Sequence, residues 1–461
     1  MPCQPLTRFY RIWRLHKMRK FTHILFAVFA SVFCLPAGAI DLSLDDAVAK
    51  ILTESQDIKK ADANIKKAKA TLDAANANRW FKLEGSATYM NMVDVSRPFS
   101  GSMNVNLPPQ LGGLVGQLMN AGGPVAQIEM PDNIFMAGLT FTQPIYTFGK
   151  IGNAVESVRS AIKMSETSRE LVRREVKYSA VDLYWTAKMT DEIVKLSEQD
   201  LKSARDARRN LTSAGRASRG NLVKIESDIA TKEIQLSDAQ FNRATAHRML
   251  KILAGIDVDE ELNLTTEFPN EFAELNAGKL TNTPEWDILN QQIRMYEKLA
   301  RSKRDGALPT LAATASYNYA SVANSADTLF DKKGNQSAYW GLALQMPIFS
   351  GGINRANAMQ EAMNAESARQ DLDKSKKITT EKYNTAIQQY DHLRGNLATL
   401  QNARDLAARA YEFSRQRFIA GQTSAIELSD VSSGLYQLDM ALLNSKYKIL
   451  MAAESVKKLG E

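Results

Sequence analysis

The chain has 461 residues, 44% of them hydrophobic and 24% charged, with 58 basic and 51 acidic side chains and a formal net charge of +7. Six of the basic residues and both cysteines fall within residues 1–39, so the remainder has 52 basic against 51 acidic residues and no cysteine. The excess charge therefore gives no support to nucleic-acid binding, and the remainder cannot be a disulfide-stabilised scaffold.

Residues 1–39 have the three parts of a secretory signal peptide. A basic head ending at Lys20 precedes an apolar run over 21–35, and Ala37-Gly38-Ala39 offers a cleavage site for small residues. A retained anchor is the alternative, but about 15 apolar residues are too few to cross a bilayer comfortably. We expect residues 1–39 to be removed on export, with Met1 or Met18 as the start.

The first repeat begins with a helix and then changes to strands. Ser43 is placed to cap a helix that runs to about residue 78, without proline or glycine. Residues 81–92 and 133–146 alternate between apolar and polar side chains, which predicts two strands with unlike faces. Residues 94–132 are rich in Gly, Pro, Met and Asn and predict a long loop.

Long helical hairpins follow. Residues 152–211 contain no proline and only the opening glycine, which predicts a helix of about 90 Å at about 1.5 Å rise per residue. A turn around Gly215 leads to a second helix that runs to about residue 253, where Gly255 is placed to end it.

The second half repeats this order. After a connecting segment over 256–282, the sequence predicts a helix over 283–304, strands over 308–319 and 339–348, a helix to 419, a turn at Gly421 and a last helix to about 459. We therefore divide the chain into a signal peptide (1–39), a first structural repeat (40–255), an equatorial connecting segment (256–282) and a second structural repeat (283–461).

A short motif recurs where each strand pair meets its long helix. Residues 143–154 read QPIYTFGKIGNA, and residues 346–356 read MPIFSGGINRA. Proline is tolerated where strand pairing stops, and glycine allows the turn into the helix. We expect strand-to-helix junctions built on five residues: Pro144, Gly149, Pro347, Gly351 and Gly352.

Four strands cannot close a membrane barrel, because the smallest spanning barrels use about eight. The sequence offers no transmembrane helix, and open sheet edges are not satisfied by lipid. Three chains would supply twelve strands. The pattern predicts a mixed α and β membrane protein, in which a membrane barrel is continued by a long helical tube.

In these features the chain resembles the TolC-like outer membrane efflux protein family over residues 41–459. The resemblance rests on Leu44-Asp45-Asp46-Ala47, on both junction motifs, and on the paired turns at Gly215 and Gly421. It implies a homotrimer in contact with outer-membrane lipid: a trimeric 12-stranded outer-membrane β-barrel, with four strands per chain, continued by a long periplasmic α-helical coiled-coil barrel. It also implies an exit duct for drug efflux or type I secretion, which conducts substrates passively from a periplasmic adaptor protein and an inner-membrane transporter to the exterior.

The resemblance also implies where the functional residues lie. The glycine turns would be the periplasmic tips that contact the adaptor, and the last turns nearby would form the periplasmic aperture. Glu427 and Asp430 would form an acidic ring, with Phe418 and Thr423 where the family has a tyrosine and an arginine. The adaptor-contact tips would be Gly215, Arg216, Ala217, Ser218, Gly421, Gln422, Thr423 and Ser424.

We expect no enzyme. His247 and His392, the histidines beyond residue 39, sit in helical patterns, and motifs such as HExxH or a phosphate-binding glycine loop are absent from the sequence. No catalytic residue, metal site or cofactor is predicted. The alternative to a pore is an exported coiled-coil adaptor or adhesin, although the two hairpins and four amphipathic strands favour the duct.

Overall fold

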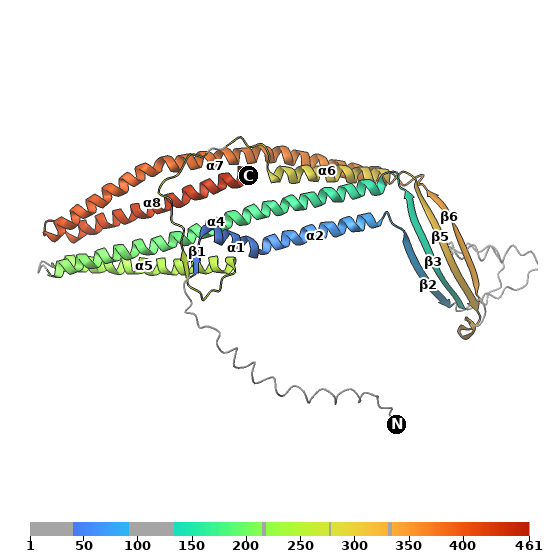
Figure 1. Cartoon of the computed structure of the whole chain (residues 1–461), viewed down its shortest axis with the longest axis horizontal. Coiled ribbons are helices and arrows are strands. Elements are labelled where there is room, and N and C mark those ends of the chain that lie inside the picture. The colour runs from blue at the N-terminus through green and yellow to red at the C-terminus, as the bar shows by residue number, and fades with distance from the viewer. Residues whose placement is uncertain (1–39, 92–132, 214–217, 276–277, 331–333, 461) are drawn as a thin grey trace, which may run out of the picture. The chain divides into compact units, whose positions relative to one another are not determined.

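The computed structural model describes residues 40–91, 133–213, 218–275, 278–330 and 334–460 (Figure 1). The expected signal peptide and the expected loop over 94–132 lie outside the described residues. The chain forms two compact units. The first is made of Met1–Asp57, Arg173–Lys279 and Lys382–Glu461, and the second of Ile58–Val172 and Leu280–Glu381.

The second unit contains a four-stranded antiparallel sheet (Figure 1). Its strands are β2 (Lys82–Asn91), β3 (Asn133–Tyr146), β5 (Thr310–Ala323) and β6 (Asn335–Gln345), in the order β2-β3-β5-β6. The expected strands are confirmed, and β5 begins two residues later and ends four residues later than its alternation predicts. The 3₁₀ turn η1 (Ala326–Thr328) follows it.

Strand register gives the sheet two unlike faces, because directly paired antiparallel residues project to the same side. In one row, Leu83 pairs with Phe141, which pairs with Ala315, which pairs with Trp340. In the next row, Glu84, Thr140, Ser316 and Tyr339 are joined in the same way. Apolar and polar rows alternate, so one face is apolar and the other carries the hydroxyl, amide and charged groups.

Helices α2 (Gln56–Ala77) and α6 (Pro284–Asp305) lead into the strand pairs, and α4 (Lys150–Ser213) and α7 (Ile353–Ile419) leave them. In the second unit, α6 and α7 share a core of four buried residues: Trp286, Ile293, Ala368 and Leu372. Among the described helices, none contains an apolar stretch long enough to cross a bilayer.

The first unit joins the rest of α4 and α7 to α1 (Leu44–Glu54), α5 (Arg219–Ala254) and α8 (Ala425–Gly460). Its core contains Tyr184 and Trp185 of α4, packed against Leu250 of α5 and Met451 of α8. Gly255 ends α5 at a φ of 66°, as expected, because this left-handed conformation suits glycine.

Two local features differ from the expectation. Strands β1 (Ile40–Leu42) and β4 (Leu262–Leu264) pair in parallel. The sequence did not predict them, because three residues are too few for an alternating pattern to reveal a strand. The expected first helix is broken at Ser55, whose ψ of 120° is extended. Serine competes for backbone hydrogen bonds and is a weak helix former, so interrupting the helix here costs little free energy.

Candidate functional site: the hairpin tips and the strand-to-helix junctions

The turn between α7 and α8 is built by backbone hydrogen bonds. Gly421 has a φ of 76°; its N–H donates to Phe418 O at 3.0 Å, and Gln422 N–H donates to Arg417 O at 2.8 Å. This pair of bonds ends a helix at a left-handed residue. Ser424 then caps α8, since its Oγ accepts from Glu427 N at 3.2 Å.

The other expected tip is described only in part. Gly215, Arg216 and Ala217 lie outside the described residues. Ser218 caps α5, and its Oγ accepts from Asn221 N at 3.3 Å. Both described tip segments thus contain a serine N-cap that begins the returning helix.

The ends of the two hairpins are joined by an apolar cluster. Phe418 of α7 is buried to 7% exposure against Leu211 of α4 and Ile225 of α5, with Ala425 and Leu428 of α8 beside it. Phenylalanine has no hydroxyl with which to form a hydrogen bond, and here its ring joins the hairpins by apolar packing.

The two acidic residues at the tip have different surroundings. Glu427 accepts a hydrogen bond from Thr423 Oγ1, and its Oε1 lies 3.6 Å from Arg417 Nη1. Asp430 is exposed, and among the described residues it has no hydrogen-bond or ion-pair partner. Residues three apart share a helix face, so both carboxylates lie on one side of α8. Arg417 offsets the negative charge of Glu427 but not that of Asp430.

Further from the turns, a group of buried polar side chains joins the two hairpins. Lys232 of α5 forms an ion pair with Asp200 of α4, with side-chain exposures of 5% and 8%. Ser432 of α8 donates to Asp200 Oδ1 at 3.0 Å, and the hydroxyls of Ser197 and Tyr436 lie 3.0 Å apart nearby. Sequence reasoning missed this group, although Lys232 interrupts a heptad row of otherwise apolar residues.

Asp191 of α4 is held by a second polar contact within the first hairpin. Its Oδ1 accepts from Arg243 Nε at 2.6 Å and lies 2.9 Å from His247 Nε2, both on α5. Burial raises the pKa of Asp191, but the hydrogen bonds from His247 and Arg243 outweigh it and the pKa falls below its ordinary value.

This lowered pKa predicts a pH effect. A carboxylate with a folded pKa below its unfolded value contributes stability that is present above the unfolded pKa, about 4, and is lost as pH falls through the folded pKa. We expect Asp191→Asn to lower the melting temperature of the helices at pH 7 and to reduce its decline between pH 5 and pH 2. Circular dichroism at 222 nm measures this; equal losses at pH 7 and at pH 2 would contradict it.

The junctions have the same backbone conformation in both repeats. Phe148 and Gly149 have φ values of 49° and 92°, and Gly351 and Gly352 have 60° and 78°. The two pairs lie four and five residues after Pro144 and Pro347, and α4 and α7 each begin at the next residue. The expected strand-to-helix turns are therefore present, with Phe148 in a conformation that disfavours any residue but glycine.

The first junction is also held from α6. Buried Asp305 accepts a hydrogen bond from Asn153 Nδ2 at 2.7 Å, and Ser302 Oγ donates to Lys150 O at 2.8 Å. A Cβ at Gly149 would lie 2.9 Å from Asp305 Oδ2. A Cβ at Gly351 or Gly352 would have none of the described atoms within 4 Å.

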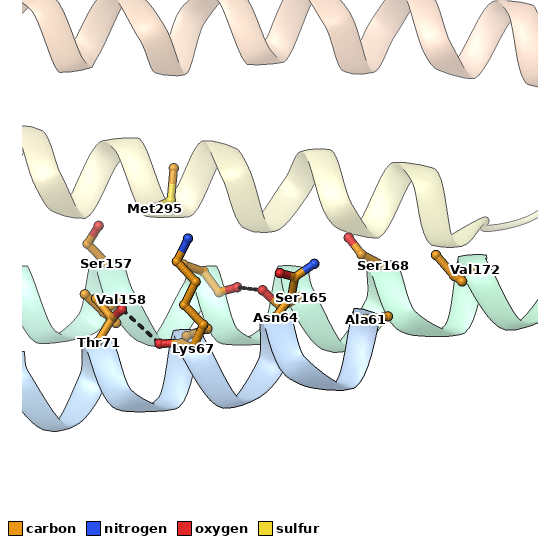
Figure 2. A pocket seen from close by; sticks show the side chains of 12 residues that line it. Ala61, Asn64, Lys67, Thr71, Ser157, Val158, Ser165, Ser168, Val172 and Met295 are labelled. Carbon is orange, nitrogen blue, oxygen red and sulfur yellow. Dashed lines mark hydrogen bonds between the residues drawn. The ribbon is translucent and has the colours of Figure 1, made fainter. Parts of the chain in front are cut away.

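A groove of about 440 Å³ lies between α2 and α4, with Met295 of α6 at its rim (Figure 2). Its lining is mostly Ala, Ser and Thr. Ser165 Oγ and Thr71 Oγ1 donate to carbonyls of their own helices at 3.0 Å, so these hydroxyls are satisfied without a ligand. In the described residues, no three of His, Cys, Asp and Glu come together as metal ligands.

Comparison with known proteins agrees with this architecture. The family model described as outer membrane efflux protein matches residues 47–255 and 280–460. The chain is 22% identical to the outer membrane protein TolC of Escherichia coli over 256 residues, which cover 50% of this chain and 51% of TolC. It is 21% identical to the alkaline protease secretion protein AprF of Pseudomonas aeruginosa, over 69% of this chain and 68% of AprF.

Among solved structures, the fold is similar to that of the CmeC outer membrane channel of Campylobacter jejuni. The TM-score is 0.73 at 19% identity, and the match covers 90% of this chain and 85% of CmeC. The predicted fold class, with strand pairs and helical hairpins in two repeats, is confirmed. The alternative of an adaptor or adhesin without a pore receives no support from these matches.

Proposed function

Because the chain belongs to the outer membrane efflux protein family, we propose that three copies of it close into one exit duct across the outer membrane. It is an outer-membrane protein, and its family consists of channels rather than enzymes. The duct would conduct its substrates passively from the periplasm to the exterior.

The observation that carries this proposal is the sheet. It has one apolar and one polar face, and its outer strands β2 and β6 each lack a partner on one side within the described residues. On β6, the side chains of Trp340 and Leu342 are 87% and 70% exposed. Three such sheets joined edge to edge would form twelve strands with lipid outside and water inside, which leaves no open edge.

The internal repeat supports closure by identical copies. Within one chain, β3 of the first repeat pairs with β5 of the second. The equivalent pairing of β6 with β2 cannot form inside a four-stranded open sheet, but it can form with the next copy. A heterologous contact of this kind closes into a ring when its rotation allows.

We assign the periplasmic mouth to the tip of α7 and α8. Three copies of Glu427 and Asp430 would form an acidic ring that favours cations, with Phe418 and Thr423 behind it. The tips, at Ser218 and Gly421 to Ser424, would contact a periplasmic adaptor protein, and an inner-membrane transporter would supply the substrate. The similarity to AprF, a protease secretion protein, makes polypeptides a candidate cargo, and membership of an efflux family makes small molecules another.

The experiment is reconstitution of the full chain, purified from outer membranes, in planar lipid bilayers. We expect discrete ion-conducting steps from a preparation that runs as a trimer on native gels. A protein that fractionates away from the outer membrane, or a trimer that conducts no ions, would contradict the proposal.

The acidic ring makes a separate prediction. Asp430 has no ion-pair partner among the described residues, whereas Glu427 is partly neutralised by Arg417, so Asp430→Asn should weaken channel block by a trivalent hexammine cation more than Glu427→Gln does. Single-channel recording with the cation on the periplasmic side measures the block. Asp373→Asn, which changes an exposed acid in the part of α7 that belongs to the second unit, is the control. Unchanged block in the double variant would remove both residues from the mouth.

A further inference from the structure

The strands of the four-stranded sheet contain only two charged residues, Lys82 and Glu84, both at the start of β2. Strands β3, β5 and β6 contain no charged residue within their bounds. Both side chains are exposed, and neither has an ion-pair or hydrogen-bond partner among the described residues. Their charges therefore stabilise no contact within the described part of the chain.

Both charges lie on the polar face of the sheet. Residues two apart in a strand project to the same side, with about 6.8 Å between their Cα atoms. The residues paired with them across the sheet are uncharged: Thr142, Thr314 and Gly341 in the row of Lys82, and Thr140, Ser316 and Tyr339 in the row of Glu84. In the proposed ring of three sheets this face lines the lumen, so both charged groups face the water inside it.

The two residues lie at the end of the sheet where the helices begin. Helix α2 ends at Ala77 and β2 starts at Lys82 (Figure 1). Three copies would place three ammonium groups and three carboxylates in two adjacent rings, at the level where the lumen passes from strands to helices. Beyond these rings, the described strands present an uncharged wall to the lumen.

The internal repeat shows that the strand does not require these charges. Residues 82–89 read KLEGSATY, and residues 310–317 of β5 read TLAATASY, with Leu, Ala and Tyr at the same three positions. Thr310 and Ala312 stand where the first repeat has Lys82 and Glu84. β5 forms an equivalent strand with an uncharged start, and threonine favours strands more than lysine does. The charges therefore belong to one repeat and add nothing to strand formation.

Two rings of opposite sign have a defined effect on ions. A single ring that produces a potential of about 1 kT would change the local concentration of each monovalent ion about threefold. The rings are about 6.8 Å apart, which is less than the Debye length of about 10 Å at 0.1 M salt, so each ring largely cancels the field of the other. Together they leave this part of the lumen nearly neutral toward small ions.

We propose that Lys82 and Glu84 are the residues that set ion selectivity in the membrane part of the duct, and that they do so by cancelling each other's field. The barrel would then admit cations and anions equally, and selection by charge would be left to the acidic residues of the periplasmic mouth. The inference rests on the proposed trimer and adds to it the two side chains that control the charge of its barrel.

The test removes one ring at a time and measures the reversal potential in planar bilayers under a KCl gradient. The starting protein carries Glu427→Gln and Asp430→Asn, so that the mouth does not mask the barrel, and the salt is about 0.01 M, where the Debye length is about 30 Å. On this background Glu84→Ala leaves three ammonium groups, and we expect the ratio of anion to cation permeability to rise about threefold. Lys82→Thr leaves three carboxylates and should change the ratio by a similar factor in the opposite direction.

Two further variants serve as matched controls. Lys82→Thr combined with Glu84→Ala gives β2 the uncharged start of β5, and it should return the permeability ratio to that of the starting protein. Thr310→Lys adds a cation at the equivalent position on the polar face of β5, and it should act in the same direction as Glu84→Ala.

The outcomes separate this inference from the proposed function. A purified trimer that conducts no ions would contradict the proposed duct itself. A conducting trimer whose reversal potential is the same in all four variants would contradict the inference alone, because the two charges would then not face the ion path. Shifts in the same direction from Glu84→Ala and from Lys82→Thr would also contradict it.

Discussion

Gly149→Val is expected to be the most damaging single substitution in the second unit. Valine at a φ of 92° is strained, and its Cβ would lie 2.9 Å from Asp305 Oδ2. Moving Asp305 would also break its hydrogen bond with Asn153. Backbone strain and the clash together cost on the order of 3 kcal/mol or more, enough to prevent most of the protein from assembling. Trimer yield from outer membranes measures the effect.

The second junction offers the matched control. Gly352 occupies the equivalent position with a φ of 78°, but none of the described atoms crowds its missing Cβ. Gly352→Val should therefore show only backbone strain, about 1–2 kcal/mol, and a smaller loss of trimer, and the further change Gly351→Val should add to it. Equal yields for Gly149→Val and Gly352→Val would show that contact with Asp305 is unimportant. Normal yield from the Gly351, Gly352 double variant would show that the junction needs no glycine.

Lys232→Met should be the most damaging change in the helical hairpins. It leaves Asp200 charged and 8% exposed, with only Ser432 as a hydrogen-bond donor among the described residues. Removing one partner of a buried pair typically costs about 3–5 kcal/mol. We expect a large fall in the helix melting temperature, together with higher channel conductance if the α4–α8 contact loosens.

An exposed ion pair within the same hairpin is the control. Arg208 and Glu226 lie 2.9 Å apart with about half of each side chain exposed. Arg208→Met should cost at most about 1 kcal/mol, because solvent screens such pairs. The double variant Lys232→Met with Asp200→Leu should recover much of the stability, since an apolar pair can replace a buried ion pair. A double variant no more stable than Lys232→Met would contradict this explanation.

The parts predicted from sequence are those with a repeating pattern. Period-two alternation located β3 at Asn133–Tyr146, and the long stretches without proline located α4 and α7. The duplicated junction motif predicted turns that the backbone repeats at Phe148 and Gly351. In each case, many residues together indicate the same element, and their local conformational preferences agree with the final structure.

The parts that could not be predicted depend on contacts between distant residues. The pairing of β1 with β4 involves three residues on each side, and the Asp200–Lys232–Ser432 group joins three helices. The ion pair between Arg417 and Glu427 was also missed, although it alters the charge expected at the mouth. Apart from the interruption of a buried heptad row at Lys232, none of these has a periodic signal, since each depends on which distant segments meet.

A disulfide between copies tests whether the sheet closes into a ring. The β3–β5 register, carried through the repeat, places Leu344 of β6 opposite Ala87 of β2 in the next copy, as Phe141 lies opposite Ala315. Beyond residue 39 the chain has no cysteine, so Leu344→Cys with Ala87→Cys should yield a covalent trimer on oxidation. Leu344→Cys with Leu83→Cys, about 13 Å out of register, should not. Monomers from the first pair, or equal linking by both, would contradict closure in this register.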